Sequence, residues 1–287
     1  MHEIGADNLI GVTRTEWRLS EDAAEFRAVA DAYLAADPAA NTVLLTVSET
    51  VRERGPFAFE ASRPARFGWQ CDADGRVIAA FVQTPPRGPL LGVMDAESAR
   101  ALARVLGPVP RVIGEDGTVR AYAAATGRGW RVFRAERLFR LGEVTEPRPV
   151  PGGAARPPTE RDVPLLQGWF ADFVTFIGEG PRPDFDVAGR VANGRLLLWE
   201  DAGRPVAMVG WTARVAGQVR IAPVYTPAEL RGRGYAGAVV ARASRDLLRS
   251  GAEQVLLFTD LANPTSNALY QRIGYRPVAE HTVVEFT

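Results

Sequence analysis

The chain has 287 residues, which is enough for two domains that each bury their own core. Its 34 basic residues, all arginine, balance 34 acidic residues, so the composition lacks the net positive charge that favours binding to nucleic acid or an anionic membrane. One cysteine, Cys71, and two histidines, His2 and His281, exclude an internal disulfide and a zinc site. The N-terminus lacks signal-peptide character and no long apolar run occurs, so we expect a cytoplasmic protein.

A segment rich in proline and glycine divides the sequence. Residues 142–158 hold five prolines, which predicts an extended, semi-rigid linker between residues 1–141 and residues 159–287. The two flanking segments have similar lengths, and they share a faint repeat. Residues 75–84 and 203–212 match at a Gly, an Arg, an Ala and a Thr.

In the first half, the hydrophobic pattern predicts alternating helices and strands. In chain order we expect a helix at 23–35, strands at 67–71, 77–83 and 90–94, a helix capped by Asp95 that ends at Leu106, a strand at 111–113, a short helix at 119–125 and strands within 130–141. No glycine-rich loop lies between Met94 and its helix, so this half has no obvious phosphate site. We interpret it as a degenerate copy of the second half, with unrelated ancestry as the alternative.

The second half has a similar pattern. We expect helices at 163–177 and 185–192, a meander of antiparallel strands at 195–200, 206–213 and 219–225, a helix at 234–250, a strand at 255–259, a helix at 265–273 and one long or two short strands within 275–286. The predicted fold class is therefore α/β (α+β), with a mixed, mostly antiparallel sheet flanked by helices, in two tandem domains.

The loop at residues 224–238 carries the strongest chemical signal, because it leads from a strand end directly into a helix. Free backbone N–H groups and the helix dipole favour an anion there. Gly232 and Gly234 allow close approach, and Arg231 and Arg233 add charge, which suits a ligand with several phosphates. The sequence matches neither the Walker motif nor the dinucleotide fingerprint. The alternatives are a glycine-rich turn with solvated arginines and an Arg-Gly tract that binds RNA.

The pattern Arg231-x-x-Gly234-x-Ala236 resembles the coenzyme A pyrophosphate loop of the GCN5-related N-acetyltransferases (GNATs). Residues 258–275, in which Asn263 follows a strand and Tyr270 lies on the next helix, resemble a later motif of the same family. The resemblance covers residues 159–287. One departure is Ala228, which stands where proline is usual and puts the exact geometry of the strand end in doubt.

The resemblance implies a GNAT-like fold with acetyl-CoA as cosubstrate and no metal. Two parallel strands would splay apart to admit the pantetheine arm, with Val224 and Thr226 at the strand end. The pyrophosphate would bind at Arg231, Gly232, Arg233, Gly234, Tyr235 and Ala236. Asn263 would contact the pantetheine or the loop beside it, and Tyr270 would protonate the departing thiolate, although a core aromatic residue is the alternative for Tyr270.

The reaction needs a base more than an acid. A thiol with a pKa near 8.5 is a fair leaving group, so an acid at Tyr270 gives modest help. An amine with a pKa near 10.4 must lose a proton before it attacks, which costs roughly 4–5 kcal/mol at neutral pH. The sequence does not identify the base. The candidates by elimination are Glu179, Asp184, Glu200, Asp201 and the C-terminal carboxylate, each of which is more simply a solvated acid.

The leading hypothesis is a GNAT-type N-acetyltransferase that moves an acetyl group from acetyl-CoA to a primary amine of a small molecule or peptide. Direct attack in a ternary complex is the implied mechanism. A non-catalytic acyl-CoA-binding module is the chief alternative, and an RNA binder fits poorly because the glycines lie at a helix start. The expected partners are acetyl-CoA and an unknown amine, with no nucleic acid and no membrane. The first half could shape the acceptor pocket, dock on the second half or form a homodimer.

Overall fold

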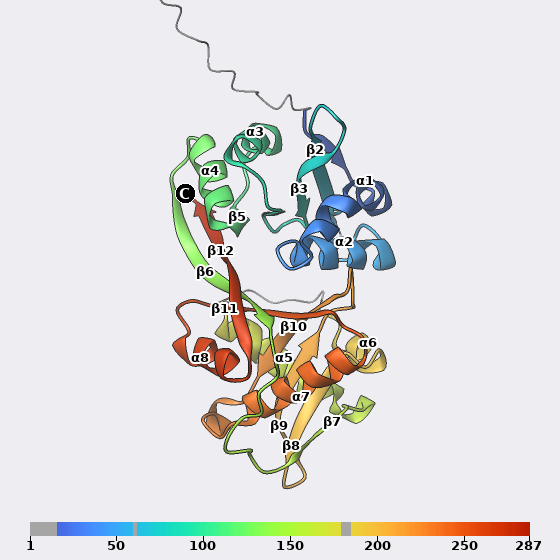
Figure 1. Cartoon of the computed structure of the whole chain (residues 1–287), viewed down its shortest axis with the longest axis vertical. Coiled ribbons are helices and arrows are strands. Elements are labelled where there is room, and N and C mark those ends of the chain that lie inside the picture. Colours follow the sequence, from blue (N-terminus) through green and yellow to red (C-terminus); the bar gives the residue numbers. More distant parts are fainter. Residues whose placement is uncertain (1–15, 60–61, 179–184) are drawn as a thin grey trace, which may run out of the picture.

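The computed structural model describes residues 16–59, 62–178 and 185–287. One continuous sheet of 12 strands runs through the molecule, in the order β1-β2-β3-β4-β5-β12-β6-β11-β10-β9-β8-β7 (Figure 1). Helices pack against it, and the predicted fold class is confirmed. Each predicted helix and strand within the described residues is present, with its ends shifted by a few residues.

The first half holds six strands and four helices among its described residues. They are β1 (Arg18–Ser20), α1 (Ala23–Ala36), α2 (Thr42–Arg54), β2 (Arg66–Cys71), β3 (Val77–Gln83), β4 (Pro89–Leu91), α3 (Ala96–Leu106), β5 (Arg111–Glu115), α4 (Asp116–Ala125) and β6 (Trp130–Leu141).

The second half repeats this order. Its elements are β7 (Ala154–Arg156), α5 (Val163–Phe176), α6 (Val187–Ala192), β8 (Leu196–Asp201), β9 (Arg204–Trp211), β10 (Gln218–Tyr225), α7 (Tyr235–Arg249), β11 (Gln254–Asp260), α8 (Pro264–Arg272) and β12 (Tyr275–Phe286), with short 3₁₀ turns before α5 and α7.

The two halves have the same topology. When each strand is matched with the strand six places further along the chain, the sheet order reads the same from both edges. The parallel pair β4 and β5 corresponds to the parallel pair β10 and β11. The faint sequence repeat falls on equivalent turns, where Gly75 and Gly203 both have positive φ, at 81° and 74°. A duplicated unit would give this arrangement, and common ancestry stays a prediction.

The halves exchange their last strands at the centre of the sheet. Strand β6 comes from the first half, yet it pairs with β11, and β12 from the second half pairs with β5. The two exchanged strands also pair with each other along most of their length. Figure 1 shows both strands running between the halves. The sheet therefore continues across the predicted boundary between residues 1–141 and residues 159–287, which stays a prediction about domains and not about independent folding.

The segment at residues 142–158 differs from a free linker. The N–H groups of Gly142 and Thr145 donate to carbonyls at the α8–β12 turn, both at 3.0 Å. Glu146 forms an ion pair with Arg245 on α7. Residues 154–156 then form β7, which pairs with β8 at the edge of the sheet. The segment is therefore held against the second half.

Three elements lack a prediction. Strands β1 and β7 have only three residues each, too few for a clear alternation. Helix α2 has the sequence TVLLTVSETVRER, in which six of the 13 residues are β-branched. Such residues have low helix propensity. Burial of its apolar side, including Leu44, Leu45 and Val51, stabilises the helix instead.

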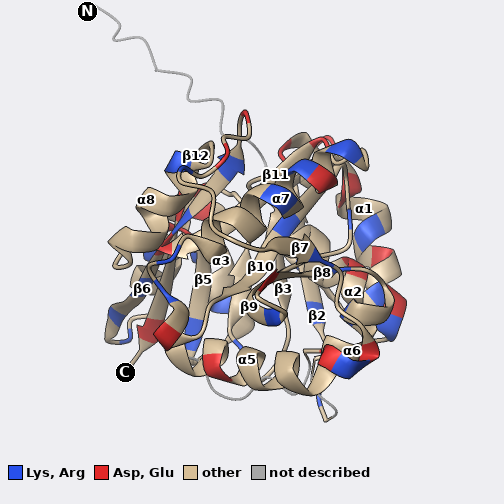
Figure 2. Ribbon diagram, turned by 90° about the horizontal axis from the view of Figure 1, so that it is seen from below, with Lys and Arg blue, Asp and Glu red and all other residues tan. Residues whose placement is uncertain are grey.

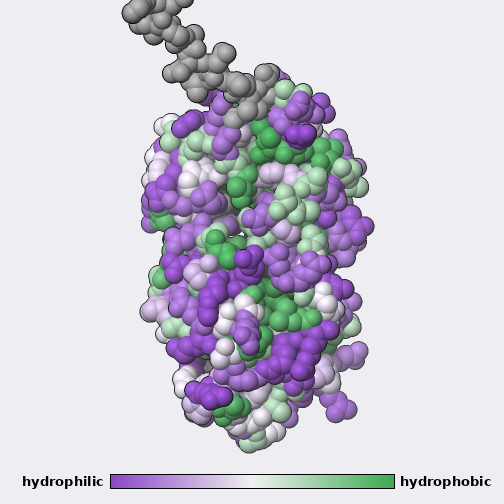
Figure 3. Space-filling view, viewed as in Figure 1, coloured by the Kyte–Doolittle hydropathy of each residue, from purple (hydrophilic) through white to green (hydrophobic). Residues whose placement is uncertain are grey.

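The described surface is mixed in charge and in hydropathy. Basic and acidic residues are interspersed over α1 and α2 (Figure 2). Apolar residues form small groups between polar ones on the face in Figure 3. Within residues 16–59, 62–178 and 185–287, no helix is both long and apolar enough to cross a bilayer. Nor do His, Cys, Asp and Glu side chains in those ranges form a group of three that could hold a metal ion.

The strand exchange generates a prediction about fragments. When residues 1–141 and 142–287 are produced separately, β6 and β12 each lose both neighbouring strands, so we expect neither fragment to be a folded monomer. Mixing or coexpressing them should restore one folded complex. Light scattering and amide NMR spectra would measure this. A fragment that is monomeric alone, with a dispersed spectrum and a cooperative unfolding transition, would contradict it.

Candidate functional site

The parallel pair at the centre of the second half separates along its length. Strands β10 and β11 pair from Gln218 and Gln254 as far as Ile221 and Leu257. Beyond that point β10 continues beside β9 after a register shift, and β11 continues beside β6. Pro223 has no N–H to offer a neighbouring strand. The two strand ends therefore form a wedge with unpaired backbone groups.

The predicted residues Val224 and Thr226 lie at the end of β10, beside this wedge. The hydroxyl of Thr226 is buried and has no hydrogen-bond partner among the described residues. Buried polar groups normally have partners. The wedge can therefore accept a ligand with hydrogen-bonding groups.

Helix α7 begins at the open side of the wedge with its N-terminus uncapped by any side chain. Gly234 is the N-cap with φ of 87°, and Gly232 has φ of 77°. Both lie in the left-handed region that favours glycine. Ala238 makes the first bond of the helix, to the carbonyl of Gly234. Within the described chain, the N–H groups of residues 232–237 bond to no acceptor, so they are available to an anion.

Space and charge at this loop agree with an anion site. A Cβ on Gly232 would meet no atom within 4 Å, and one on Gly234 would meet only Pro151, at 3.7 Å. Arg231 Nε donates to the carbonyl of Thr226 at 3.1 Å, and Arg233 donates to the carbonyl of Glu229 at 3.3 Å. Both guanidinium groups therefore stay at the exposed loop and add positive charge to the helix end.

The equivalent place in the first half is closed by a carboxylate. Asp95 is the N-cap of α3, and its side chain accepts a hydrogen bond of 2.9 Å from the N–H of Ser98. A negative group already occupies this helix end, so a phosphate would meet repulsion. The start of α3 is therefore closed to an anion, whereas the start of α7 is open.

Asn263 has a clear local role. Its side-chain oxygen accepts from the N–H of Ser266 at 3.0 Å and caps α8. The sequence analysis missed Asn267, whose amide donates to the carbonyls of Asp260 and Asn263, both at 2.8 Å. Its side-chain oxygen is buried with no partner among the described residues. The spacing of asparagines around Pro264 was a signal for this fixed turn.

Tyr270 lies in the core beneath the loop. It is 7% exposed and packs against the rings of Phe139 and Tyr275, with centroids 6.5 and 6.0 Å away. Burial raises the pKa of Tyr270 to about 12. Its neighbour Leu269 would contact a Cβ on Gly237 at 3.0 Å, so α8 lies against the first turn of α7.

The first half has a tyrosine at the equivalent place. Tyr122 is the seventh residue of α4, as Tyr270 is of α8. Tyr122 is fully buried, and burial raises its pKa to about 12 as well. Packing in the core is therefore enough to explain a tyrosine at this helix position, without a catalytic role. The acid role of Tyr270 stays a prediction.

The carboxylates named as candidate bases are mostly engaged elsewhere. Glu200 forms an ion pair with Arg156, which also binds Asp162. Asp201 accepts a hydrogen bond of 2.5 Å from the hydroxyl of Tyr235. Residue 287 lies at the far end of β12, where its N–H donates to Gly129 in the first half. Glu179 and Asp184 lie outside the described residues.

A second group of polar residues lies where the halves meet, which we call the junction cluster: Thr42, Glu115, Glu136, Gln218, Arg220 and His281. In the sheet, His281 is directly opposite Glu136 on β6 and Glu115 on β5. The ring of His281 meets Phe258 edge-on at 4.9 Å. These residues are far apart in sequence, and only the strand exchange brings them together, so sequence reasoning could not group them.

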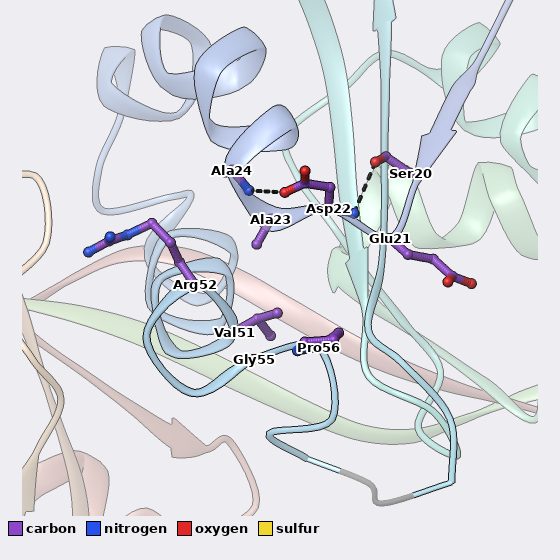
Figure 4. A pocket seen from close by; sticks show the side chains of 9 residues that line it. All are labelled: Ser20, Glu21, Asp22, Ala23, Ala24, Val51, Arg52, Gly55 and Pro56. Atoms are coloured by element: carbon purple, nitrogen blue, oxygen red, sulfur yellow. Dashed lines mark hydrogen bonds between the residues drawn. The ribbon is translucent and has the colours of Figure 1, made fainter.

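A groove lies in the first half, between the start of α1 and the end of α2 (Figure 4). It measures about 570 Å³ and is lined by Ser20, Glu21, Asp22, Ala23, Ala24, Val51, Arg52, Gly55 and Pro56. Asp22 already caps α1 by accepting from the N–H of Ala24 at 2.7 Å. The groove therefore offers no free helix end to an anion.

Comparison with known protein families finds a match in the second half. Residues 200–284, which include the loop and Tyr270, match the family model of FR47-like proteins. No curated protein matches the sequence. This part of the second half is therefore similar to FR47-like proteins.

Solved structures share the fold of the whole chain. A GNAT-family acetyltransferase from Colwellia psychrerythraea superposes with a TM-score of 0.63 at 10% identity, over 95% of this chain and 99% of that one. A GCN5-related N-acetyltransferase from Sphaerobacter thermophilus gives 0.60 at 16% identity, over 94% and 95%. A Drosophila protein gives 0.64 at 16% identity, over 94% and 98%. The chain therefore has the GNAT fold.

His281 generates a prediction about pH. The pKa of His281 is lowered from 6.5 to about 4, chiefly by burial, while Glu115 raises it and Arg220 lowers it. Between these pH values the unfolded chain binds a proton that the folded protein does not, so stability falls as the pH falls. When the pH falls from 7 to 4.5, the free energy of unfolding should decrease in both proteins. We expect this decrease to be about 2 kcal/mol smaller in His281→Gln than in the wild type. Urea unfolding at both pH values would measure this, and equal losses would contradict it.

Proposed function

We propose that this protein is an N-acetyltransferase that moves an acetyl group from acetyl-CoA to a primary amine. The observation that carries the proposal is the uncapped N-terminus of α7, with its free N–H groups, directly beside the wedge between β10 and β11. A diphosphate suits the helix end, and an extended amide-bearing arm suits unpaired strand backbone. The GNAT fold and the FR47-like domain support the same activity.

The proposed roles follow from position. The N–H groups of Gly232, Gly234 and Ala236, with the two loop arginines, bind the pyrophosphate. Val224 faces the pantetheine arm, as does the hydroxyl of Thr226, which has no hydrogen-bond partner among the described residues. Asn263 and Asn267 hold the loop on the opposite side of the wedge, where Asn267 keeps an unused acceptor. The backbone of Tyr235 belongs to the same helix end, while its side chain binds Asp201.

The proposed reaction is a direct attack in a ternary complex. The amine nitrogen bonds to the thioester carbonyl carbon, the carbon–sulfur bond breaks, and the thiolate leaves as the nitrogen loses a proton. Tyr270 is the proposed acid, but burial raises its pKa to about 12, well above that of a thiol. Proton transfer from Tyr270 to the thiolate is therefore uphill, so the phenol adds little to the rate. Deprotonation of the amine sets the larger barrier.

Two measurements test the proposal together. Thiol release from acetyl-CoA across a panel of amines measures turnover, and calorimetry measures CoA binding. Turnover with at least one amine supports the enzyme. Tight CoA binding with no turnover on a broad panel would favour a binding module instead. Absence of CoA binding would contradict both.

Gly234→Asp should abolish CoA binding, because it adds an anion at the end of α7 where the phosphates would lie. Calorimetry would show a loss on the order of 100-fold or more in affinity. Gly75→Asp is the matched control, since Gly75 has a similar φ of 81° in an open turn of the first half. If Gly234→Asp binds CoA as well as Gly75→Asp does, the phosphate site lies elsewhere.

Tyr270→Phe should keep CoA affinity and slow turnover by less than roughly tenfold, because the phenol is a weak acid for this thiolate. Tyr122→Phe, at the equivalent place in the first half, controls for lost packing and stability. Steady-state kinetics with each variant would separate the two effects. Equal rates for Tyr270→Phe and the wild type would remove the acid role.

A further inference from the structure

Arg220 lies on β10 immediately before the strands separate. It is opposite Leu256 on β11, one residue before the last pair of the ladder at Ile221. Its strand neighbours Val219 and Ile221 pack into the core beneath α7. Because side chains alternate along a strand, Arg220 points to the other face of the sheet.

That face is where the first half meets the second. Arg220 Nη1 donates to the hydroxyl of Thr42, at the start of α2, with a long distance of 3.5 Å. The hydroxyl of Thr42 in turn donates at 2.8 Å to the side-chain oxygen of Gln218, which lies two residues before Arg220 on β10. Arg220 is therefore part of the junction cluster and lies at the base of the wedge, on the face opposite α7.

Negative charge is scarce around this guanidinium. Glu136 is the acid that acts on it most, yet Glu136 lies 3.0 Å from Arg134 in an ion pair. Among the described residues, no carboxylate forms an ion pair with Arg220 itself. His281 is neutral above about pH 4. Burial lowers the pKa of Arg220 to about 10, even though Glu136 raises it, so the cluster leaves part of the cost of burying this charge uncompensated.

Hydrogen-bond donors are also in excess there. The side-chain nitrogen of Gln218 is buried and has no partner among the described residues. Arg220 presents five N–H donors in a planar fork, and Thr42 accepts only one long bond from it. A planar anion with two oxygens would satisfy both side chains.

We propose that Arg220 binds a carboxylate of the acceptor, so that the substrates are small amines that carry a carboxylate. The inference rests on the proposed function and specifies its acceptor class. A carrier bound at the end of α7 enters the wedge from one face, which leaves the opposite face to the acceptor. Strand residues rise about 3.3 Å each, so a carboxylate on Arg220 holds an amine one or two carbons away near the point where the strands split. Binding orients the amine toward the thioester.

The test uses acceptors in pairs that differ only by a carboxylate and a carboxamide near the amine: glycine with glycinamide, alanine with alaninamide, and β-alanine with β-alaninamide. The wild-type protein should prefer the carboxylate member. Arg220→Gln should raise the KM for that member on the order of tenfold or more and remove the preference. The same variant should keep acetyl-CoA affinity and turnover with the carboxamide.

Two variants control for a purely structural role. Thr42→Val removes the hydroxyl contact between the halves but keeps the guanidinium, so it should keep the preference. Arg242→Gln removes an exposed arginine on α7 that pairs with Asp246, and it should change nothing. Arg220→Lys should keep part of the preference, since it keeps the charge but loses the fork. Thermal unfolding of each variant reports on stability separately.

Acceptor binding can be measured without turnover, so it tests the role of Arg220 separately from the proposed reaction. Calorimetric titration of each pair into the CoA-saturated protein measures acceptor affinity directly. A wild-type protein with no preference for carboxylates, or an Arg220→Gln protein with the same preference, overturns the inference. A preference that depends on Arg220 in a protein that turns over no amine would support this site and overturn the proposed function alone.

Discussion

The pairing of β6 with β11, and of β12 with β5, is the constraint on which the rest of the structure depends. Each half of the chain completes its part of the sheet with the last strand of the other. This pairing fixes the two halves relative to each other through backbone hydrogen bonds rather than through a mobile linker. It also carries α2 to the face of β10, so that Thr42 meets Arg220. The first half therefore lies against the face of β10 that is opposite α7.

The two halves share a topology but differ at one helix end. In the second half, Gly234 leaves the first N–H groups of α7 free and allows a close approach. In the first half, the carboxylate of Asp95 caps α3. The parallel strands β4 and β5 pair at a single position, Leu90 with Ile113. The difference between a glycine cap and an acidic cap therefore leaves one helix end open to an anion and the other closed by a carboxylate. The tyrosines at equivalent places in α4 and α8 show that packing, and not chemistry, is shared by both halves.

Local signals in the sequence were enough to predict most elements and the loop at the start of α7. Hydrophobic periodicity located the meander of β8, β9 and β10, and the glycines marked the helix end, because both depend on residues close in the chain. Helix α2 was missed because its β-branched residues hide a helix that burial stabilises. The strand exchange could not be predicted, since β5, β6, β11 and β12 carry similar patterns and any of them could pair. The junction cluster depends on that pairing, which is why Arg220 and Glu136 gave no signal as a group.

The strand exchange has a consequence for how such a chain can change over evolutionary time. In a chain of two independent halves, the first half could be lost without unfolding the second. Here its loss would leave β11 as an exposed edge and β12 without neighbours, so selection for a folded protein is enough to retain it. Substitutions at the start of α3, where Asp95 lies, leave the sheet intact, whereas residues of β6 remain under the same pressure as those of β11 and β12, with which they pair. Substitution rates should therefore depend on whether a residue pairs in the shared part of the sheet, and not on which half of the sequence it belongs to.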